Sequence, residues 1–306
     1  MDIHVLNFDN SLTSQKNLLA AYSPRIIGLQ DFSSSARLWM GKKTAEAIKD
    51  RIKGISGCAV NFLGSGDFHH VSSLLTEEIK ESASLIVFDF HPDWDMLPPS
   101  LGCGSWVTHA LRNPNIIKCL LIGASSCDLS FPYIQSGNLK SLENNRVEVY
   151  PYQHRPSSVF LSDVPLNKSI KLKKGLFKTE ISWSELKGRN LNNFFLSLIS
   201  NLPSKKVYVS IDKDCLKNDY ALTNWEEGFF SLDELLIMLK ITKENLIILG
   251  VDITGDYSQA AYPDIIKRII SRLDHPKNVK ADRLDAGVIS SINEATNLKL
   301  LSVLNP

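Results

Sequence analysis

Mostly hydrophobic runs of five to eight residues recur along the chain, and longer segments with hydrophobic residues three or four positions apart lie between them. The runs are hydrophobic on both faces, which is typical of parallel strands covered by helices on each side. The expected strands are His4–Phe8, Val60–Gly64, Leu85–Phe90, Cys119–Gly123, Val147–Tyr152, Val207–Asp212 and Leu246–Ile253. The expected helices are Ala36–Lys53, Val71–Glu81, Leu191–Ser200, Leu232–Lys240, Pro263–Leu273 and Leu284–Leu298. This alternation predicts an α/β fold of three layers (αβα), with a doubly wound, mostly parallel sheet.

One segment interrupts the alternation. Gln153–Asn167 contains Pro156, Pro165 and several serines, a strand-like run follows it, and the sheet pattern then resumes. The chain has no internal repeat and no low-complexity segment. We therefore expect a single domain over residues 1–306, with a long excursion from its sheet.

Composition narrows the function classes. Of the 306 residues, 43% are hydrophobic and 22% are charged, which excludes global disorder. The net charge is only +1, so nothing favours a nucleic acid or a membrane as partner. The N-terminus lacks the pattern of a signal peptide, and no hydrophobic run approaches the ~18 residues of a membrane span. The five cysteines form no C-x-x-C pair, which favours reduced thiols and a cytoplasmic location.

Acidic residues and histidines follow four of the expected strands. The segments read G-S-G-D-F-H-H at Gly64–His70, D-F-H-P-D-W-D at Asp89–Asp95, S-I-D-K-D at Ser210–Asp214 and V-D-I-T-G-D at Val251–Asp256. Open α/β sheets bind ligands at the carboxyl ends of their strands. We therefore expect the four segments to meet in one crevice.

The spacing of these residues indicates a metal centre. Alternate residues of an extended segment point the same way, so each motif presents its carboxylates and imidazoles together. So many carboxylates need a cation, because like charges at close range would force protonation. Oxygen and imidazole ligands suit Mn²⁺, with Zn²⁺, Fe²⁺ or Co²⁺ as alternatives. We predict two ions held by six residues, of which one histidine is left open: His69 (or His70), Asp89, His91, Asp93, Asp212 and Asp214.

In order and spacing, the motifs resemble those of the arginase/agmatinase (ureohydrolase) family: G-G-D-H, D-A-H-x-D, S-x-D-x-D and a later acidic residue. The resemblance extends from about residue 60 to residue 256 and indicates a divergent member. It implies an arginase/deacetylase-like fold and a hydrolase of C–N bonds in linear amidines. The substrate would be a small cationic guanidino compound, attacked by a hydroxide that bridges two Mn²⁺ ions. Because relatives are usually trimers or hexamers, it also implies a homo-oligomer.

The resemblance assigns the metal ligands as well. The first ion would be held by His69, Asp89, Asp93 and Asp212, and the second by His91, Asp89, Asp212 and Asp214. Asp89 and Asp212 would bridge the ions. Asp214 would also accept a proton from the hydroxide.

Other candidate residues stand where this chain departs from the family pattern. Asp252 occupies the place of a glutamate that pairs with the guanidinium, and its side chain is one methylene shorter. His109 lies two residues beyond the expected position of a proton-shuttling histidine, and a structural role inside a helix is the alternative. Asp95 and Glu226 are candidates for substrate contact, with a surface role as the alternative for each. An extra residue in the first motif leaves His69 and His70 both possible, with His69 favoured.

Two other functions compete with this interpretation. A zinc-dependent amidohydrolase related to the histone deacetylases would share the fold and use a His-His pair, to which His69 and His70 superficially correspond. Asp93 and the S-I-D-K-D segment favour two metals over one zinc ion. The other alternative is a non-catalytic, metal-binding descendant, which the intact set of six ligands disfavours.

Overall fold

The computed structural model describes residues 1–55, 59–97, 100–132, 134–160, 164, 167–259, 264–274 and 284–304, without the side chains of residues 270–274. Pro263, with which an expected helix begins, lies outside the described residues. No helix among those that are described is long and hydrophobic enough to cross a membrane.

Eight parallel strands form the central sheet, in the order β2-β1-β4-β13-β12-β5-β7-β8. They are β1 (Asp2–Asn7), β2 (Arg25–Gly28), β4 (Ala59–Gly64), β5 (Ala83–Phe88), β7 (Ile116–Gly123), β8 (Val147–Pro151), β12 (Lys206–Asp212) and β13 (Ile247–Thr254). All seven expected strands are present, so the predicted parallel sheet is confirmed. β2 was missed because it is a four-residue edge strand with one buried residue, and therefore has no hydrophobic run.

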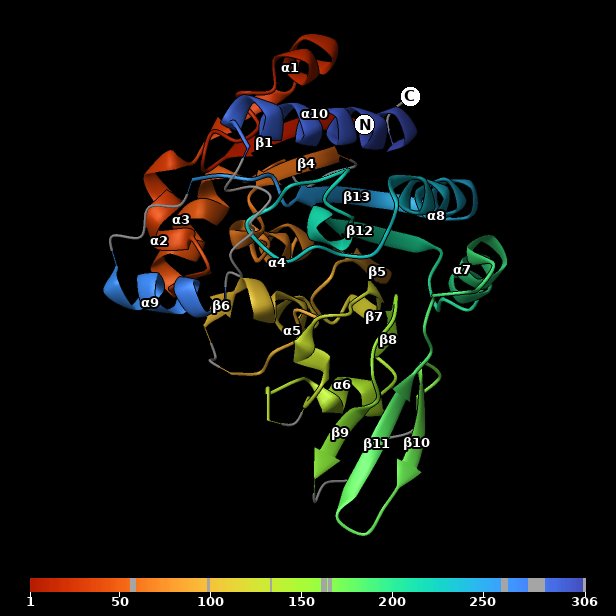
Figure 1. Cartoon of the computed structure of the whole chain (residues 1–306). Coiled ribbons are helices and arrows are strands. Elements are labelled where there is room, and N and C mark those ends of the chain that lie inside the picture. Colours follow the sequence, from red (N-terminus) through yellow and green to blue (C-terminus); the bar gives the residue numbers. More distant parts are fainter. Residues whose placement is uncertain are drawn as a thin grey trace.

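Helices cover both faces of this sheet (Figure 1). One hydrophobic cluster joins alternate strand residues to α3 (Lys42–Arg51), α4 (Val71–Thr76), α5 (Trp106–Ala110) and α6 (Leu139–Glu143). The other cluster joins the remaining strand residues to α1 (Lys16–Tyr22), α7 (Leu191–Ser200), α8 (Leu232–Asn245) and α10 (Ala286–Leu304). The predicted three-layer αβα architecture is confirmed.

The segment expected to form one helix over Ala36–Lys53 is divided in two. α2 (Ser33–Ala36) ends before Arg37, and the two-residue strand β3 (Trp39–Met40), which pairs with β6 (Leu101–Gly102), precedes α3. Arg37 is buried and donates to Asp67 at 2.5 Å. The chain leaves the helix here because Leu38 takes a left-handed conformation, with φ of 68°.

The expected excursion forms a small antiparallel sheet of its own. Its strands are β9 (Ser157–Phe160), β10 (Ile170–Lys174) and β11 (Lys178–Trp183), in the order β10-β11-β9. In Figure 1 this sheet projects from the body of the protein below α6. Trp183 packs against Trp94, with ring centroids 6.3 Å apart, so the small sheet shares a hydrophobic cluster with the central one. Beyond it, α9 (Ile265–Asp274) lies close to α2 and β3, because Lys267 donates to backbone oxygens of Ser35 and Trp39.

Candidate metal centre

The four acidic segments meet where four adjacent strands end: β4, β13, β12 and β5. After β4 the backbone turns at Gly64, whose φ is 83° and where a Cβ would lie 2.7 Å from an oxygen of Asp9. A short 3-10 turn, Gly66–Phe68, follows, and its first residues are held by Ser65, whose side chain accepts from the backbone N–H of Asp67. This local geometry carries His69 to the sheet edge.

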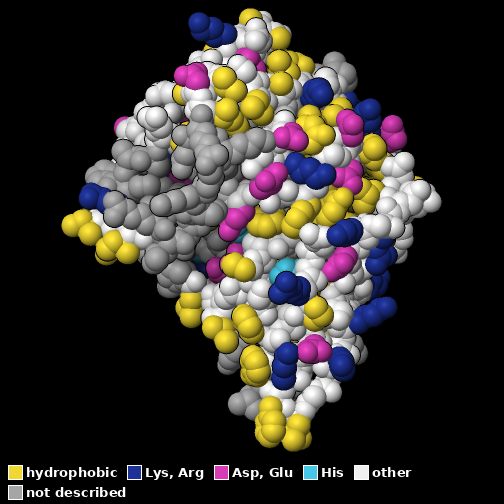
Figure 2. All heavy atoms as spheres, in the orientation of Figure 1, with side chains coloured by type: hydrophobic (Ala, Val, Ile, Leu, Met, Phe, Trp, Pro, Cys, Tyr) yellow, Lys and Arg dark blue, Asp and Glu magenta, His cyan; other side chains and the backbone are white. Residues whose placement is uncertain are grey.

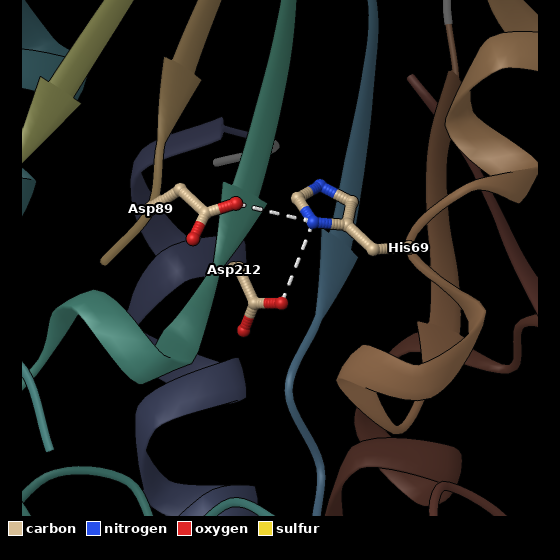
Figure 3. Close-up of side chains that lie close together, drawn as sticks. All are labelled: His69, Asp89 and Asp212. Carbon is tan, nitrogen blue, oxygen red and sulfur yellow. Dashed lines mark ion pairs between the residues drawn. The ribbon is translucent and has the colours of Figure 1, made fainter. Parts of the chain in front are cut away.

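Three carboxylates surround one nitrogen of His69 (Figure 3 shows two of them). Nδ1 of His69 lies 3.2 Å from Asp89 Oδ2, 3.1 Å from Asp93 Oδ2 and 3.4 Å from Asp212 Oδ2. Neither Nδ1 of His69 nor Oδ2 of Asp89 has a partner in hydrogen-bond geometry among the described residues. Buried polar atoms rarely lack a hydrogen-bond partner. The arrangement fits an ion that would lie between the nitrogen and the oxygens.

A second group lies beside the first and shares Asp89 with it. Nδ1 of His91 lies 2.8 Å from Asp214 Oδ2 and 3.8 Å from Asp89 Oδ1. Asp89 thus presents one oxygen to His69 and the other to His91. Backbone N–H groups hold one oxygen of each of two carboxylates: Phe90 donates to Asp214 Oδ1, and Asp214 donates to Asp212 Oδ1.

The charges of the two groups are not balanced by the protein. Burial raises the pKa of Asp212 to about 7, and the carboxylate of Asp214 adds to this. Burial and the carboxylates of Asp93 and Asp214 raise the pKa of Asp89 well above its usual value. Burial alone would lower the pKa of His69, but Asp89 and Asp93 outweigh it and raise that pKa well above 6.5. Without a cation, the site must therefore hold extra protons, and its oxygen and imidazole donors fit divalent ions that would replace them.

His69, and not His70, faces these carboxylates. His70 is fully buried and belongs to neither group of candidate ligands. Burial, together with the positive charges of Lys267 and His69, lowers the pKa of His70 to about 3. His70 is therefore a neutral imidazole inside the protein.

An acidic cavity of about 400 Å³ opens onto the two groups. Asp95 and Glu226 line it, as does Asp128. Burial and the carboxylates of Asp128 and Asp93 raise the pKa of Asp95 to about 8. Glu226 Oε2 lies 3.0 Å from Nε2 of His91. Figure 2 shows acidic side chains across the middle of one face of the protein, with Lys and Arg side chains among them.

Two of the expected site residues do not reach this cavity. Asp252 is fully buried, is not among the residues that line the cavity, and accepts from Ser210 Oγ at 2.6 Å. His109, on α5, is half-buried and also does not line the cavity. The placement of Asp252 differs from the expectation because the residue lies within β13, with its side chain on a covered face of the sheet. Gly255 follows the last residue of that strand, and there is no room for a side chain there, because a Cβ would lie 2.5 Å from Asp212 Oδ1.

Sequence reasoning missed Asp128 at the site, and it did not give the hydrogen bond that Trp106 makes there. Asp128 follows β7, and the rule that ligands bind at strand ends could have found it. Trp106 donates from its indole N–H to Asp93 Oδ2 at 2.7 Å, and its ring lies 4.7 Å from that of His69. A buried tryptophan carries no pattern in the sequence that would distinguish this role from packing in the core.

Comparison with known proteins supports the fold. No family model matches the chain. An uncharacterised protein of Thermotoga maritima is 27% identical over 258 residues, which are 83% of this chain and 79% of that protein. Proclavaminate amidino hydrolase from Streptomyces clavuligerus superposes with a TM-score of 0.58 at 12% identity, covering 99% of this chain and 91% of that one.

Two further solved structures share this fold. Arginase from Bacillus subtilis has a TM-score of 0.56 at 14% identity, with 100% of this chain and 99% of that chain covered. A Trypanosoma cruzi formiminoglutamase with Mn²⁺ also has a TM-score of 0.56, at 9% identity, with 100% and 94% covered. The parallel sheet and the order of the motifs agree with this likeness. The chain has the fold of the ureohydrolases and is a divergent example of that fold.

Proposed function

We propose that the protein is a binuclear, manganese-dependent hydrolase that cleaves a C–N bond of a guanidino compound. The observation that carries this proposal is the pair of buried donor groups that share Asp89, where one ring nitrogen and one carboxylate oxygen have no hydrogen-bond partner in the described part of the chain. The fold, common to solved hydrolases of amidino and guanidino compounds, supports it.

The residues around His69 would hold one ion and those around His91 the other, with Asp89 between them. When bound, the two ions would lower the pKa of a water molecule and stabilise negative charge that develops on the substrate. We assign proton uptake from that water to Asp214 at Oδ2, since its Oδ1 is held by the N–H of Phe90. Glu226 would orient His91 through Nε2, so that Nδ1 faces Asp214.

A guanidinium group would be drawn into the cavity by its acidic walls. Asp128 is placed to attract the positive charge of such a substrate, which would in turn favour the ionised form of Asp95, and Trp225 and Trp39 provide flat aromatic surfaces beside them. The cationic guanidino compound would therefore enter between the metal ligands and these side chains.

Metal content and turnover test the proposal together. After loading with Mn²⁺ and desalting, elemental analysis should give about two ions per chain, and a screen of guanidino compounds with urea detection should find a substrate. Asp214→Asn should abolish turnover, whereas Asp233→Asn, on the exposed surface of α8, serves as the matched control. A folded protein with almost no bound metal would refute the proposal. A single zinc ion with hydrolysis of an acylated amine would instead favour a deacetylase-like amidohydrolase.

A further inference from the structure

A row of buried polar residues crosses the central sheet behind His69. His4 on β1 pairs in register with Asn61 on β4, Asn61 with Asp252 on β13, and Asp252 with Ser210 on β12. Residues paired in register point to the same face, so the four side chains lie next to one another across four strands. All four are buried, and buried polar groups destabilise a protein unless they are hydrogen-bonded.

Hydrogen bonds link one end of this row to the candidate metal centre. Ser210 Oγ lies 2.8 Å from Nε2 of His69 and donates to Asp252 Oδ1 at 2.6 Å. A serine hydroxyl has one proton to donate. Because that proton goes to Asp252, Ser210 must accept from His69, and Nε2 of His69 must carry a hydrogen. The lone pair of the neutral ring is then on Nδ1, the nitrogen that faces the three carboxylates.

This direction depends on an ionised Asp252. Burial raises the pKa of Asp252, but the nearby charge of His69 and the hydrogen bond from Ser210 favour the charged form. Ser210 thus donates to Oδ1 of a carboxylate that does not face the cavity, while Oδ2 of Asp252 has no hydrogen-bond partner among the described residues. Any buried aspartate needs hydrogen-bond donors. The donor to Asp252 is Ser210, which also accepts from His69, and this second hydrogen bond determines which nitrogen of the His69 ring has a free lone pair.

We propose that Asp252 is a positioning residue, which acts through Ser210 to present Nδ1 of His69 to a divalent ion. The proposal rests on the metal centre proposed above, but not on the identity of the substrate. Metal-ligating histidines usually donate their second N–H to a carboxylate or carbonyl group, which orients the ring. Here a serine is inserted between the ring and the carboxylate, whereas Glu226 is placed to orient His91 directly.

Replacement of Asp252 by asparagine should reverse the direction of the hydrogen bonds. An amide NH₂ facing Ser210 would donate to Oγ, and the serine proton would then be donated to Nε2 of His69. The hydrogen of the neutral ring would move to Nδ1, where it would block an ion. The affinity for one Mn²⁺ should fall about 10- to 100-fold, as for other residues that support metal ligands, while the second ion is held almost as before.

The test is a titration of the metal-free protein with Mn²⁺, in which the EPR signal of the free ion reports binding independently of activity. Asp252→Asn and Ser210→Ala should each weaken the binding of one Mn²⁺ ion. Ser210→Thr keeps the hydroxyl, so its affinity for that ion should stay within about threefold of wild type. Ser84→Ala removes another buried hydroxyl, on β5, which has no hydrogen-bond partner among the described residues, and should change nothing. Urea formation by Asp252→Asn should recover when Mn²⁺ is saturating.

The possible outcomes separate this proposal from the proposed function. If the wild-type protein binds no Mn²⁺, the metal centre itself is refuted, and with it the positioning role. If the wild type binds two ions and Asp252→Asn binds them equally well, only the positioning role is overturned. Turnover lost at full metal occupancy would place Asp252 on the substrate instead. Should Asp252→Asn fail to fold, the difference between Ser210→Ala and Ser210→Thr decides.

Discussion

Two buried groups of charged residues lie at the carboxyl ends of β12 and β13, and their charges are balanced in opposite ways. In the first, Lys213 forms an ion pair with Asp256 at 2.8 Å, with both side chains almost wholly buried. Asp256 Oδ1 also accepts from Gln15 at 2.6 Å and from Asn297 at 3.2 Å. The second group is the candidate metal centre, where four carboxylates face two imidazoles.

The two groups share one short segment of chain. Lys213 stands between Asp212 and Asp214, and its side chain points to Asp256 while the two aspartates face the metal centre. In the first group the positive and negative charges balance each other. Its hydrogen bonds join the segment that follows β1, and also α10, to the end of β13, so its role is stability. In the second group the charges balance only when a cation or extra protons are added. The difference indicates which buried charges serve folding and which serve ligand binding.

The largest effect is expected from Asp89→Asn, because Asp89 faces both imidazoles. The affinity of this variant for each Mn²⁺ ion should fall by a factor of about 100 or more, which corresponds to a loss of about 3 kcal/mol or more in binding free energy. The metal-free variant, however, should be more stable than metal-free wild type, because one of several mutually repelling carboxylates is gone. Metal titration and urea unfolding in EDTA measure the two quantities. Equal loss of both ions in Asp214→Asn would show that Asp89 has no special bridging position.

Asp256→Asn should have the opposite effect on folding. It leaves the ammonium group of Lys213 buried without a carboxylate, so the free energy of unfolding should fall by about 3–5 kcal/mol. Lys213→Met should cost less, because Asp256 would keep Gln15 and Asn297 as donors. Urea unfolding of both variants gives the comparison. A smaller loss in Asp256→Asn than in metal-free Asp89→Asn would contradict the division into a balanced and an unbalanced group.

The metal-free protein should lose stability as the pH rises. The pKa of Asp212 is raised from 3.8 to about 7 by burial and by Asp214, so the folded state binds a proton that the unfolded state releases. That contribution is complete below about pH 4 and is lost as the pH rises through 7. The raised pKa values of His69 and His91 act in the same direction above pH 6.5. Unfolding in EDTA across this range should show the decline, and saturating Mn²⁺ should reduce it; a flat profile in EDTA would argue against trapped protons.

The smallest effect is expected from His70→Ala. Because His70 is a neutral, buried residue outside both donor groups, the variant should keep both ions and lose only packing energy. His69→Ala should lose one ion, since Nδ1 of that ring faces three carboxylates. Elemental analysis of the two variants after Mn²⁺ loading distinguishes them. Loss of an ion from His70→Ala alone would reverse the assignment.

The sequence by itself determined seven of the eight strands of the central sheet and the polar segments at the ends of four of them. Hydrophobic runs such as Val60–Gly64 and Val207–Asp212 specify buried strands locally, and the motifs that follow them place Asp89, His91 and Asp214 at one edge. These features depend on residues that are close in the chain, where periodicity and spacing carry the information. They were sufficient to predict the fold and to name candidate metal ligands, with His69 and His70 both left open.

Only the tertiary structure decided how those side chains face one another. His69 and His70 are adjacent in sequence, and packing alone turns one toward the carboxylates and the other into the interior. Asp252 resembles a residue at a strand end, but its register with Asn61 and Ser210 places it behind His69, away from the cavity. Register, strand order and burial arise from contacts between segments far apart in the chain, such as Asn61 and Val251, which are 190 residues apart, and no local pattern encodes them.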